Sequence, residues 1–253
     1  MSRVTILDGQ WDKLVVFLNG CPNVYVGNEE DCLLFIEGIL WMVRSGAQWR
    51  LLPEKYGAWN SVYKRFDRWS QKGVWEKMHT YCANDPDMES IMIDSTVVRA
   101  HPCAAGAMKK EGQEVDQALG RSRGGFSTKI HVLVDGLGNP LDFILTGGQV
   151  ADVTQAKPLL EGKKADNALM DKAYDADEVI NQIESLGMIA VIPPKSNRKY
   201  QRDYDRHLYK ERHLVECFIN KIKHYRRVFS RFDKTARNFM SFVRFAAALI
   251  WLR

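Results

Sequence analysis

Cysteine pairs, long apolar runs and a leader pattern are what this sequence lacks. Its five cysteines contain no Cys-x-x-Cys pair and are odd in number, which argues against a disulfide framework and a zinc ribbon and indicates a reducing compartment. The longest late apolar stretch, residues 245–252, is far shorter than the roughly 20 residues of a membrane span. The N-terminus mixes charged with apolar residues, unlike a signal peptide. We therefore expect a soluble, cytoplasmic protein.

Basic residues are abundant only in the last quarter of the chain. The formal net charge is +5, yet residues 195–253 carry 16 Lys or Arg against 5 Asp or Glu, a net of +11, and the remainder has a net of −6. Such a segment suggests a polyanionic partner, because each neutralised phosphate releases condensed counterions. A merely solvated basic surface is the alternative interpretation.

Helical patterns dominate residues 1–86. Asn28 before an acidic first turn is typical of a helix start, and the following apolar run continues to a stop at Gly46. A second helix is predicted from near Asn60 to Gly73. A helix, a short turn and a helix with a basic face are compatible with a helix-turn-helix, although many three-helix bundles share this pattern. We expect a DNA-binding module here, whose candidate contacts are Lys64, Arg65 and Arg68.

Strand patterns begin at residue 89. Residues 90–98, 128–134 and 141–145 predict three strands in meander order. Alternating elements follow: a helix at 154–160, a strand at 168–171, a helix at 177–186, a strand at 189–192, and helices at 206–229 and 236–252. This is the order of a ribonuclease-H-like α/β fold, a mixed five-stranded sheet flanked by helices. We assign it to residues 87–253, with a mobile insertion near 102–125.

Asp94 and Asp171 occupy equivalent places on two predicted strands, because each follows three consecutive apolar residues. A carboxylate in this place either points into a cleft at the sheet edge or is an ordinary turn residue. Two such residues on neighbouring strands favour the cleft, since hard divalent cations need clustered oxygen ligands. Lys129, on the second predicted strand, borders the same cleft or lies in the core or on the surface.

A narrow polar face on the predicted late helix carries Glu216. At about 100° per residue, Tyr209, Arg212 and Lys223 fall within an arc of roughly 60° that includes Glu216. The apolar stripe of this helix lies elsewhere around it. An ordinary Arg212–Glu216 pair explains two of these residues but not the alignment of Tyr209 and Lys223.

These motifs resemble those of insertion-sequence DDE transposases, in particular the insertion sequence 5 family. Tyr209-x2-Arg212-x3-Glu216-x6-Lys223 is similar to the signature around the third acidic residue. Residues 94–101 and 171–175 are similar to the earlier acidic motifs, although Ala173 stands where members often carry Gly. Residues 125–131 and 138–141 resemble the strands between them, and residues 46–53 and 59–66 resemble the leading helical module.

The resemblance implies a transposase that cuts and rejoins DNA at the terminal inverted repeats of an insertion sequence. Asp94, Asp171 and Glu216 would be the catalytic residues and would hold two Mg²⁺ ions, with Mn²⁺ as a substitute. Arg212 and Lys223 are implied contacts to phosphates of the transposon end, Lys129 is a further candidate DNA contact, and Tyr209 would stack on an unpaired base. The expected partners are the double-stranded transposon ends and target DNA, bound by a homodimer or higher assembly in the bacterial cytoplasm, at the nucleoid.

Two alternatives stay open. A related ribonuclease-H-like nuclease would hydrolyse DNA without strand transfer, but it needs neither the N-terminal module nor the basic face beside Glu216. A DNA-binding relative that lost its chemistry is disfavoured because all three carboxylates are present.

Overall fold

The computed structural model describes residues 5–22, 24–106, 116–122 and 124–253. The chain forms two compact units, which we call the helical unit (residues 1–84, 99–117 and 222–253) and the sheet unit (residues 85–98 and 118–221). This division differs from the boundary predicted at residue 86, because residues 222–253 belong with the N-terminal helices rather than with the sheet.

The predicted insertion at 102–125 is only partly described. Residues 107–115 and 123 lie outside the described residues. The described part contains the 3-10 turn η3 (Pro102–Ala104) and the short strand β2 (Gly120–Ser122). Ala105, which follows η3, has an extended backbone, and β2 pairs antiparallel with the start of β3.

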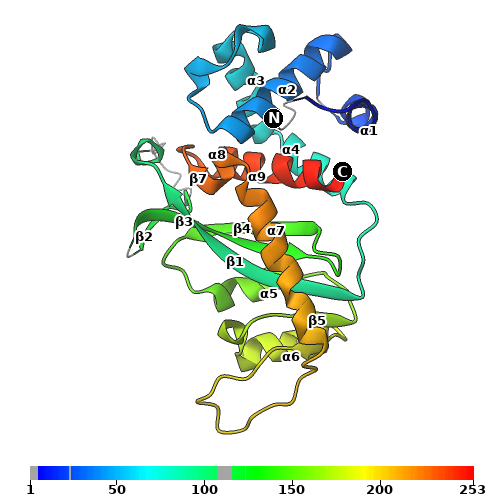
Figure 1. Ribbon diagram of the computed structural model, residues 1–253, viewed down its shortest axis with the longest axis vertical. Coiled ribbons are helices and arrows are strands. Elements are labelled where there is room, and N and C mark those ends of the chain that lie inside the picture. The colour runs from blue at the N-terminus through cyan, green and yellow to red at the C-terminus, as the bar shows by residue number, and fades with distance from the viewer. Residues whose placement is uncertain (1–4, 23, 107–115, 123) are drawn as a thin grey trace. The chain divides into compact units, whose positions relative to one another are not determined.

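The sheet unit is a mixed sheet with helices on both faces (Figure 1). Its strands are β1 (Ser90–Ala100, whose last two residues belong to the helical unit), β2, β3 (Gly125–Val134), β4 (Pro140–Gly147), β5 (Asn167–Leu169) and β6 (Ile189–Val191). The main order is β4-β3-β1-β5-β6, with β2 also on β3. β3 and β4 are antiparallel, whereas β1, β5 and β6 run parallel. This order confirms the predicted ribonuclease-H-like sheet.

Strand alternation divides the side chains of this sheet between two apolar layers. Ile91 and Ile93 of β1 and Ala168 of β5 pack with α5 (Ala156–Leu160) and α6 (Asp177–Ser185) on one face. α7 (His213–Lys223) lies across the other face (Figure 1), where Phe218 contacts Phe143 with ring centroids 5.9 Å apart. Because successive side chains of a strand point to opposite faces, residues that follow Ile93 and Met170 face α7. The unit is completed by η4 (Asp152–Gln155), η5 (Lys172–Tyr174) and η6 (Leu208–Arg212).

The helical unit has an aromatic core made from both ends of the chain. It contains α1 (Asp8–Gly20), α2 (Glu29–Ser45), η1 (Trp49–Leu51), η2 (Glu54–Tyr56), α3 (Trp59–Gln71), α4 (Val74–Cys82), η3, α8 (Arg226–Phe229), β7 (Ser230–Arg231) and α9 (Ala236–Trp251). Phe242 of α9 stacks on Phe66 of α3 at 4.4 Å, and Phe245 meets Trp75 of α4 edge-on at 5.3 Å. The last helix therefore closes the core that the first helices begin.

Local signals explain where α2 begins and ends. The Asn28 side chain accepts a hydrogen bond from the Glu30 amide at 2.8 Å, which satisfies one free donor of the first turn. Gly46 ends the helix with a φ of 65°, in the left-handed region that glycine adopts without a steric penalty. Both boundaries were predicted from the sequence.

Two sequence-based expectations about helices were incomplete. α2 and α3 are joined by residues 46–58, which form η1 and η2; this is longer than the three- or four-residue turn of a helix-turn-helix. The predicted helix 206–229 is broken into η6, α7 and α8. The Asp205 carboxylate accepts hydrogen bonds from the His207 and Leu208 amides at 2.7 and 2.9 Å, which starts η6. Among the described residues no helix has both the length and the apolar character needed to cross a membrane.

Candidate active site

Asp94 and Asp171 lie side by side beyond the paired segment of β1 and β5. The parallel register ends with Met92 opposite Leu169, and each aspartate lies two residues further along its strand direction. Neighbouring strands are about 4.8 Å apart. Because two residues restore the same face of a strand, both carboxylates face α7.

Arg212 connects Asp94 with Glu216. Its guanidinium donates to Asp94 Oδ2 at 3.0 Å and also to Glu216 Oε1. Glu216 is one turn further along the chain, on α7, and its side chain is half exposed. The predicted Arg212–Glu216 pair is therefore present, and it reaches a strand more than a hundred residues earlier in the sequence.

Tyr209 joins this group from η6. The Arg212 guanidinium carbon lies 5.9 Å from the centre of the Tyr209 ring, and Tyr204 packs edge-on against the same ring at 5.5 Å. Burial raises the pKa of Tyr209, Arg212 opposes this rise, and the negative charge of Asp171 adds to it. Three of the four residues on the predicted polar face thus gather at the sheet edge.

The charge of Asp171 affects the pKa of Asp94. Burial raises the pKa of Asp94 above its usual value; the Ser95 amide and Arg212 oppose this rise, and Asp171 adds to it. Tyr174, fully buried in the α5–α6 layer, has its pKa raised by burial and then by Asp152, Asp94 and Asp171. The charges of Asp94 and Asp171 thus act on each other and on Tyr174 across the sheet.

A second set of residues, which the sequence analysis missed, supports Asp94 from the opposite face. Ser95 donates to Asp152 Oδ1 at 2.7 Å, and Lys129 donates to the same oxygen at 2.8 Å. Burial acts to raise the pKa of Asp152, but the Lys129 and Ser95 hydrogen bonds outweigh it, so the pKa is lowered. His131 is buried beside them and bonds Thr146 at 2.8 Å. No strand-end pattern marks Asp152, which lies in η4.

The predicted DNA contacts have different environments. Lys64 and Arg68 are exposed on α3. Arg65 is used inside its unit, because its guanidinium donates to Cys32 Sγ at 3.1 Å and lies 4.4 Å from the centre of the Phe35 ring. The Lys129 ammonium likewise donates within the protein, to Asp152 and, at 2.7 Å, to the Val150 carbonyl. Lys223 is the last residue of α7 and is half-buried; it belongs to the helical unit.

The three predicted metal ligands do not form a single metal-binding cluster in this structure. Within the described ranges, no group of three or more His, Cys, Asp or Glu side chains is close enough to hold a metal ion. Asp94 and Asp171 are neighbours, whereas Glu216 reaches Asp94 through Arg212. The Asp171 side chain also accepts a hydrogen bond from the Ala173 amide at 2.8 Å, which fixes its orientation at the start of η5.

Comparisons with known proteins match both parts of the chain. The family described as "Transposase DDE domain" matches residues 85–237, and the family described as "Putative transposase of IS4/5 family" matches residues 6–79. A putative transposase for insertion sequence element IS6501 from Brucella ovis is 42% identical over 132 residues, which cover 50% of this chain and 99% of that protein. A putative transposase for insertion sequence element IS402 from Burkholderia cepacia is 30% identical over 135 residues, 49% of this chain and 62% of that protein.

Solved transposase structures are more distant. The piggyBac transposase synaptic complex with hairpin DNA has a TM-score of 0.40 at 13% identity, over 78% of this chain and 50% of that chain. The Mos1 mariner paired-end complex with Mn has a TM-score of 0.28 at 14% identity, over 86% of this chain and 76% of that chain. The family match over residues 85–237 and the relative from Brucella ovis decide the assignment: the chain belongs to the DDE transposases of bacterial insertion sequences.

Proposed function

We propose that Asp94, Asp171 and Glu216 are the catalytic carboxylates with which this transposase cuts and rejoins DNA at the terminal inverted repeats of its insertion sequence. The observation that carries the proposal is the β1–β5 register, which makes Asp94 and Asp171 neighbours on the face where α7 presents Glu216. Asp94 and Glu216 both accept hydrogen bonds from the Arg212 guanidinium, so Glu216 lies one side chain away from the aspartate pair.

The donor set fits a magnesium site. All three side chains are carboxylates, the hard oxygen ligands that Mg²⁺ prefers, and Mn²⁺ accepts the same ligands. Two bound ions would activate the attacking oxygen and stabilise the leaving oxygen of an in-line displacement at phosphorus. The nearby Ser95, Asp152 and Lys129 lie on the opposite face of the sheet, where they hold β1 in place without supplying a ligand.

The reaction divides into two displacements. In cleavage, water attacks the phosphorus, a P–O bond forms, and the 3′ oxygen of the transposon end leaves with a proton. In strand transfer, that 3′-hydroxyl loses its proton and attacks a target phosphate, whose own 3′ oxygen leaves. The carboxylates and Arg212 remain chemically unchanged through both steps, so no protein nucleophile is needed.

Basic and aromatic residues near the carboxylates are suited to hold the transposon end. Arg212 offers a planar guanidinium that matches phosphate geometry, and Tyr209 offers a ring for an unpaired base. Lys64, Arg68 and Lys223 would contact the phosphates of double-stranded DNA. Arg65 and Lys129 form their contacts within the protein and would stabilise the fold rather than bind DNA. We expect a homodimer or higher assembly, since the two ends of one element must be cut together.

The test is an end-processing assay with the full chain, Mg²⁺ and duplex DNA that carries the repeats flanking the gene. Wild type should nick the repeat ends and join them to target DNA. Asp94→Ala should lose both products but still bind the duplex, and Glu211→Ala, an exposed acid beside Arg212, should behave as wild type. Full activity of Asp94→Ala, or wild type that is inactive with both Mg²⁺ and Mn²⁺, would refute the proposal. Cleavage without joined products would identify a simple nuclease.

A further inference from the structure

A short basic segment between β6 and η6 folds back onto the turn that follows Asp171. We call residues 195–202 the arginine segment. Its donors to the side chain of Asp175, the residue after η5, are the Lys195 amide at 2.8 Å, Arg198 Nε at 2.6 Å and the Arg202 guanidinium. The Lys195 ammonium also donates to the Asp175 main-chain carbonyl at 3.1 Å. One aspartate therefore joins the two segments through both its side chain and its backbone.

Burial makes these donors necessary. The Asp175 carboxylate is fully buried, whereas the Arg198 and Arg202 side chains are 21% and 31% exposed. Burial acts to raise the pKa of Asp175, but Arg198, the Lys195 amide and Arg202 outweigh it, so the pKa is lowered. A buried charge is costly once it loses its partner. Asp175 therefore keeps the arginine segment against the turn.

The same two arginines also contact an exposed carboxylate. Arg198 and Arg202 donate to Asp177, the first residue of α6, at 2.6 and 3.5 Å. The Asp177 side chain is 75% exposed, so water screens these bonds. The two acids thus form a natural comparison, in which Asp175 should hold the arginine segment more strongly than Asp177 does.

The turn η5 connects Asp175 with Asp171. The Asp171 side chain caps this turn by accepting a hydrogen bond from the Ala173 amide at 2.8 Å. The Tyr174 amide donates to the Asp171 carbonyl at 3.1 Å, and the Asp175 amide donates to the Lys172 carbonyl at 3.2 Å. Because so short a 3-10 turn has few bonds of its own, whatever holds Asp175 in place also holds the Asp171 side chain.

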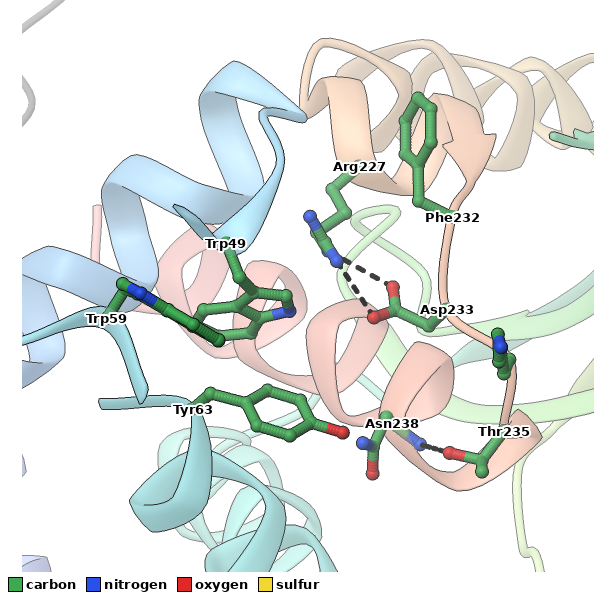
Figure 2. A pocket seen from close by; sticks show the side chains of 9 residues that line it. Trp49, Trp59, Tyr63, Arg227, Phe232, Asp233, Thr235 and Asn238 are labelled. Atoms are coloured by element: carbon green, nitrogen blue, oxygen red, sulfur yellow. Dashed lines mark hydrogen bonds and ion pairs between the residues drawn. The ribbon is translucent and has the colours of Figure 1, made fainter. Parts of the chain in front are cut away.

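A buried arginine–aspartate pair in the helical unit lacks such a connection. Figure 2 shows Arg227, which donates to both carboxylate oxygens of Asp233 at 3.1 and 2.9 Å. None of the described residues that line the pocket beside this pair is one of the proposed catalytic carboxylates. That pair fits a structural role alone, whereas Asp175 lies one short turn from Asp171.

We propose that Asp175 is a positioning residue for Asp171 and that Arg198 keeps Asp175 in place. In this role Asp175 acts through η5 rather than as a ligand. Loss of a residue that orients a metal ligand typically weakens metal binding by about 10- to 100-fold. The inference rests on the proposed function in taking Asp171 as a metal ligand, but the effect on the turn itself needs no metal.

The first measurement is amide hydrogen exchange of residues 172–176 in the full chain without metal. Arg198→Gln should speed exchange of the Ala173 amide by at least about tenfold, because it removes a hydrogen bond to a buried charge. Arg206→Gln removes the same charge at an exposed position outside the arginine segment and should leave the exchange unchanged. Asp177→Asn removes only the exposed partner and should speed the exchange by less than about fivefold.

The second measurement is the Mn²⁺ affinity of the same proteins, by isothermal titration calorimetry, with the melting temperature recorded alongside. Arg198→Gln should weaken Mn²⁺ binding by about tenfold, and Arg206→Gln should bind as wild type does. Asp175→Asn should have a larger effect than Arg198→Gln. If Asp175→Asn does not fold, Arg198→Gln decides alone, since the Arg198 side chain is partly exposed. A merely structural pair would lower the melting temperature without changing the Mn²⁺ affinity of the folded protein.

Unchanged exchange in Arg198→Gln, or equal changes in Arg198→Gln and Arg206→Gln, would overturn the proposal. Faster exchange with an unchanged Mn²⁺ affinity would also overturn it, because the turn would then not position a metal ligand. Wild type that binds no Mn²⁺, although the variants differ in exchange as expected, refutes the proposed function alone. Wild type that binds Mn²⁺ and processes repeat ends, without any difference in exchange between the variants, refutes the positioning role alone.

Discussion

The two units use arginine in opposite ways. In the sheet unit, Arg212 is partly exposed and holds two carboxylates at the edge of the site. In the helical unit, Arg227 and Arg231 are buried, and they bind Asp233, Ala47 and backbone carbonyls of the segment before α9. The basic segment 195–253 therefore contains arginines at the candidate site and arginines buried in the core. Its net charge alone overstates the positive charge that is exposed for DNA binding.

The largest effect expected is on catalysis in the sheet unit. Asp171→Ala removes one of two neighbouring carboxylates, so cleavage of repeat ends should fall by at least about 10³-fold, as the loss of several kcal/mol of transition-state stabilisation requires. Binding of the same duplex should be kept, measured by fluorescence anisotropy. Glu178→Ala, an exposed acid on α6, is the matched control. Equal activity of Asp171→Ala and this control would remove Asp171 from the site.

The second effect concerns the stability of the helical unit. Arg227→Met leaves Asp233 buried without its partner, and breaking such a pair lowers the free energy of unfolding by about 3–5 kcal/mol. Urea unfolding followed by tryptophan fluorescence measures the change, because Trp49 and Trp75 report on this core. Arg68→Met, at an exposed position, should change it by no more than about 0.5 kcal/mol. Similar values for both variants would contradict a structural role for Arg227.

The third effect is a pH dependence in the sheet unit. Burial lowers the pKa of His131 from 6.5 to about 4, with Lys129 adding to this and Asp152 opposing it. Between these two pH values His131 is protonated in the unfolded chain but neutral in the folded chain. The free energy of unfolding therefore falls as pH drops from 6.5 toward 4, by at most about 3 kcal/mol. His131→Gln keeps a group that can bond Thr146 and should flatten the unfolding free energy across this range. A slope equal to that of wild type would exclude His131 as its source.

The smallest effect tests the same substitution in the other unit. Arg212→Met removes the partner of Asp94, whose side chain is 21% exposed, and of Glu216, whose side chain is 53% exposed. Both are more exposed than Asp233, at 6%, so the free energy of unfolding should fall by less than the loss of about 3–5 kcal/mol expected for a fully buried pair. The comparison with Arg227→Met, in the same urea titration, would fail if Arg212→Met proved equally destabilising, because Arg212 would then be a structural residue too.

Local chemistry made much of the fold predictable, including the two strands that carry the proposed catalytic aspartates. Asn28 and Gly46 mark the ends of α2 through their own side chain and backbone, and apolar runs before Asp94 and Asp171 identify β1 and β5. The Ser95–Asp152 bond was not predictable, since it joins residues 57 apart through a 3-10 turn without periodicity. The break between α7 and α8 was hidden for another reason: Tyr225 is buried and continues the apolar pattern where the helix stops.

The position of α9 constrains how the protein can be made. Phe242 and Phe245 supply aromatic surface that Phe66 and Trp75 need, yet they are synthesised long after those two residues. Until then the early helices hold an uncovered face of large rings, which in a nascent chain invites chaperones or aggregation. A stop codon between Glu216 and Phe242 would spare the three acidic residues but leave the helical unit without α9. The codons for α9, rather than those for the acidic motifs, therefore decide whether a copy of the gene gives a folded product.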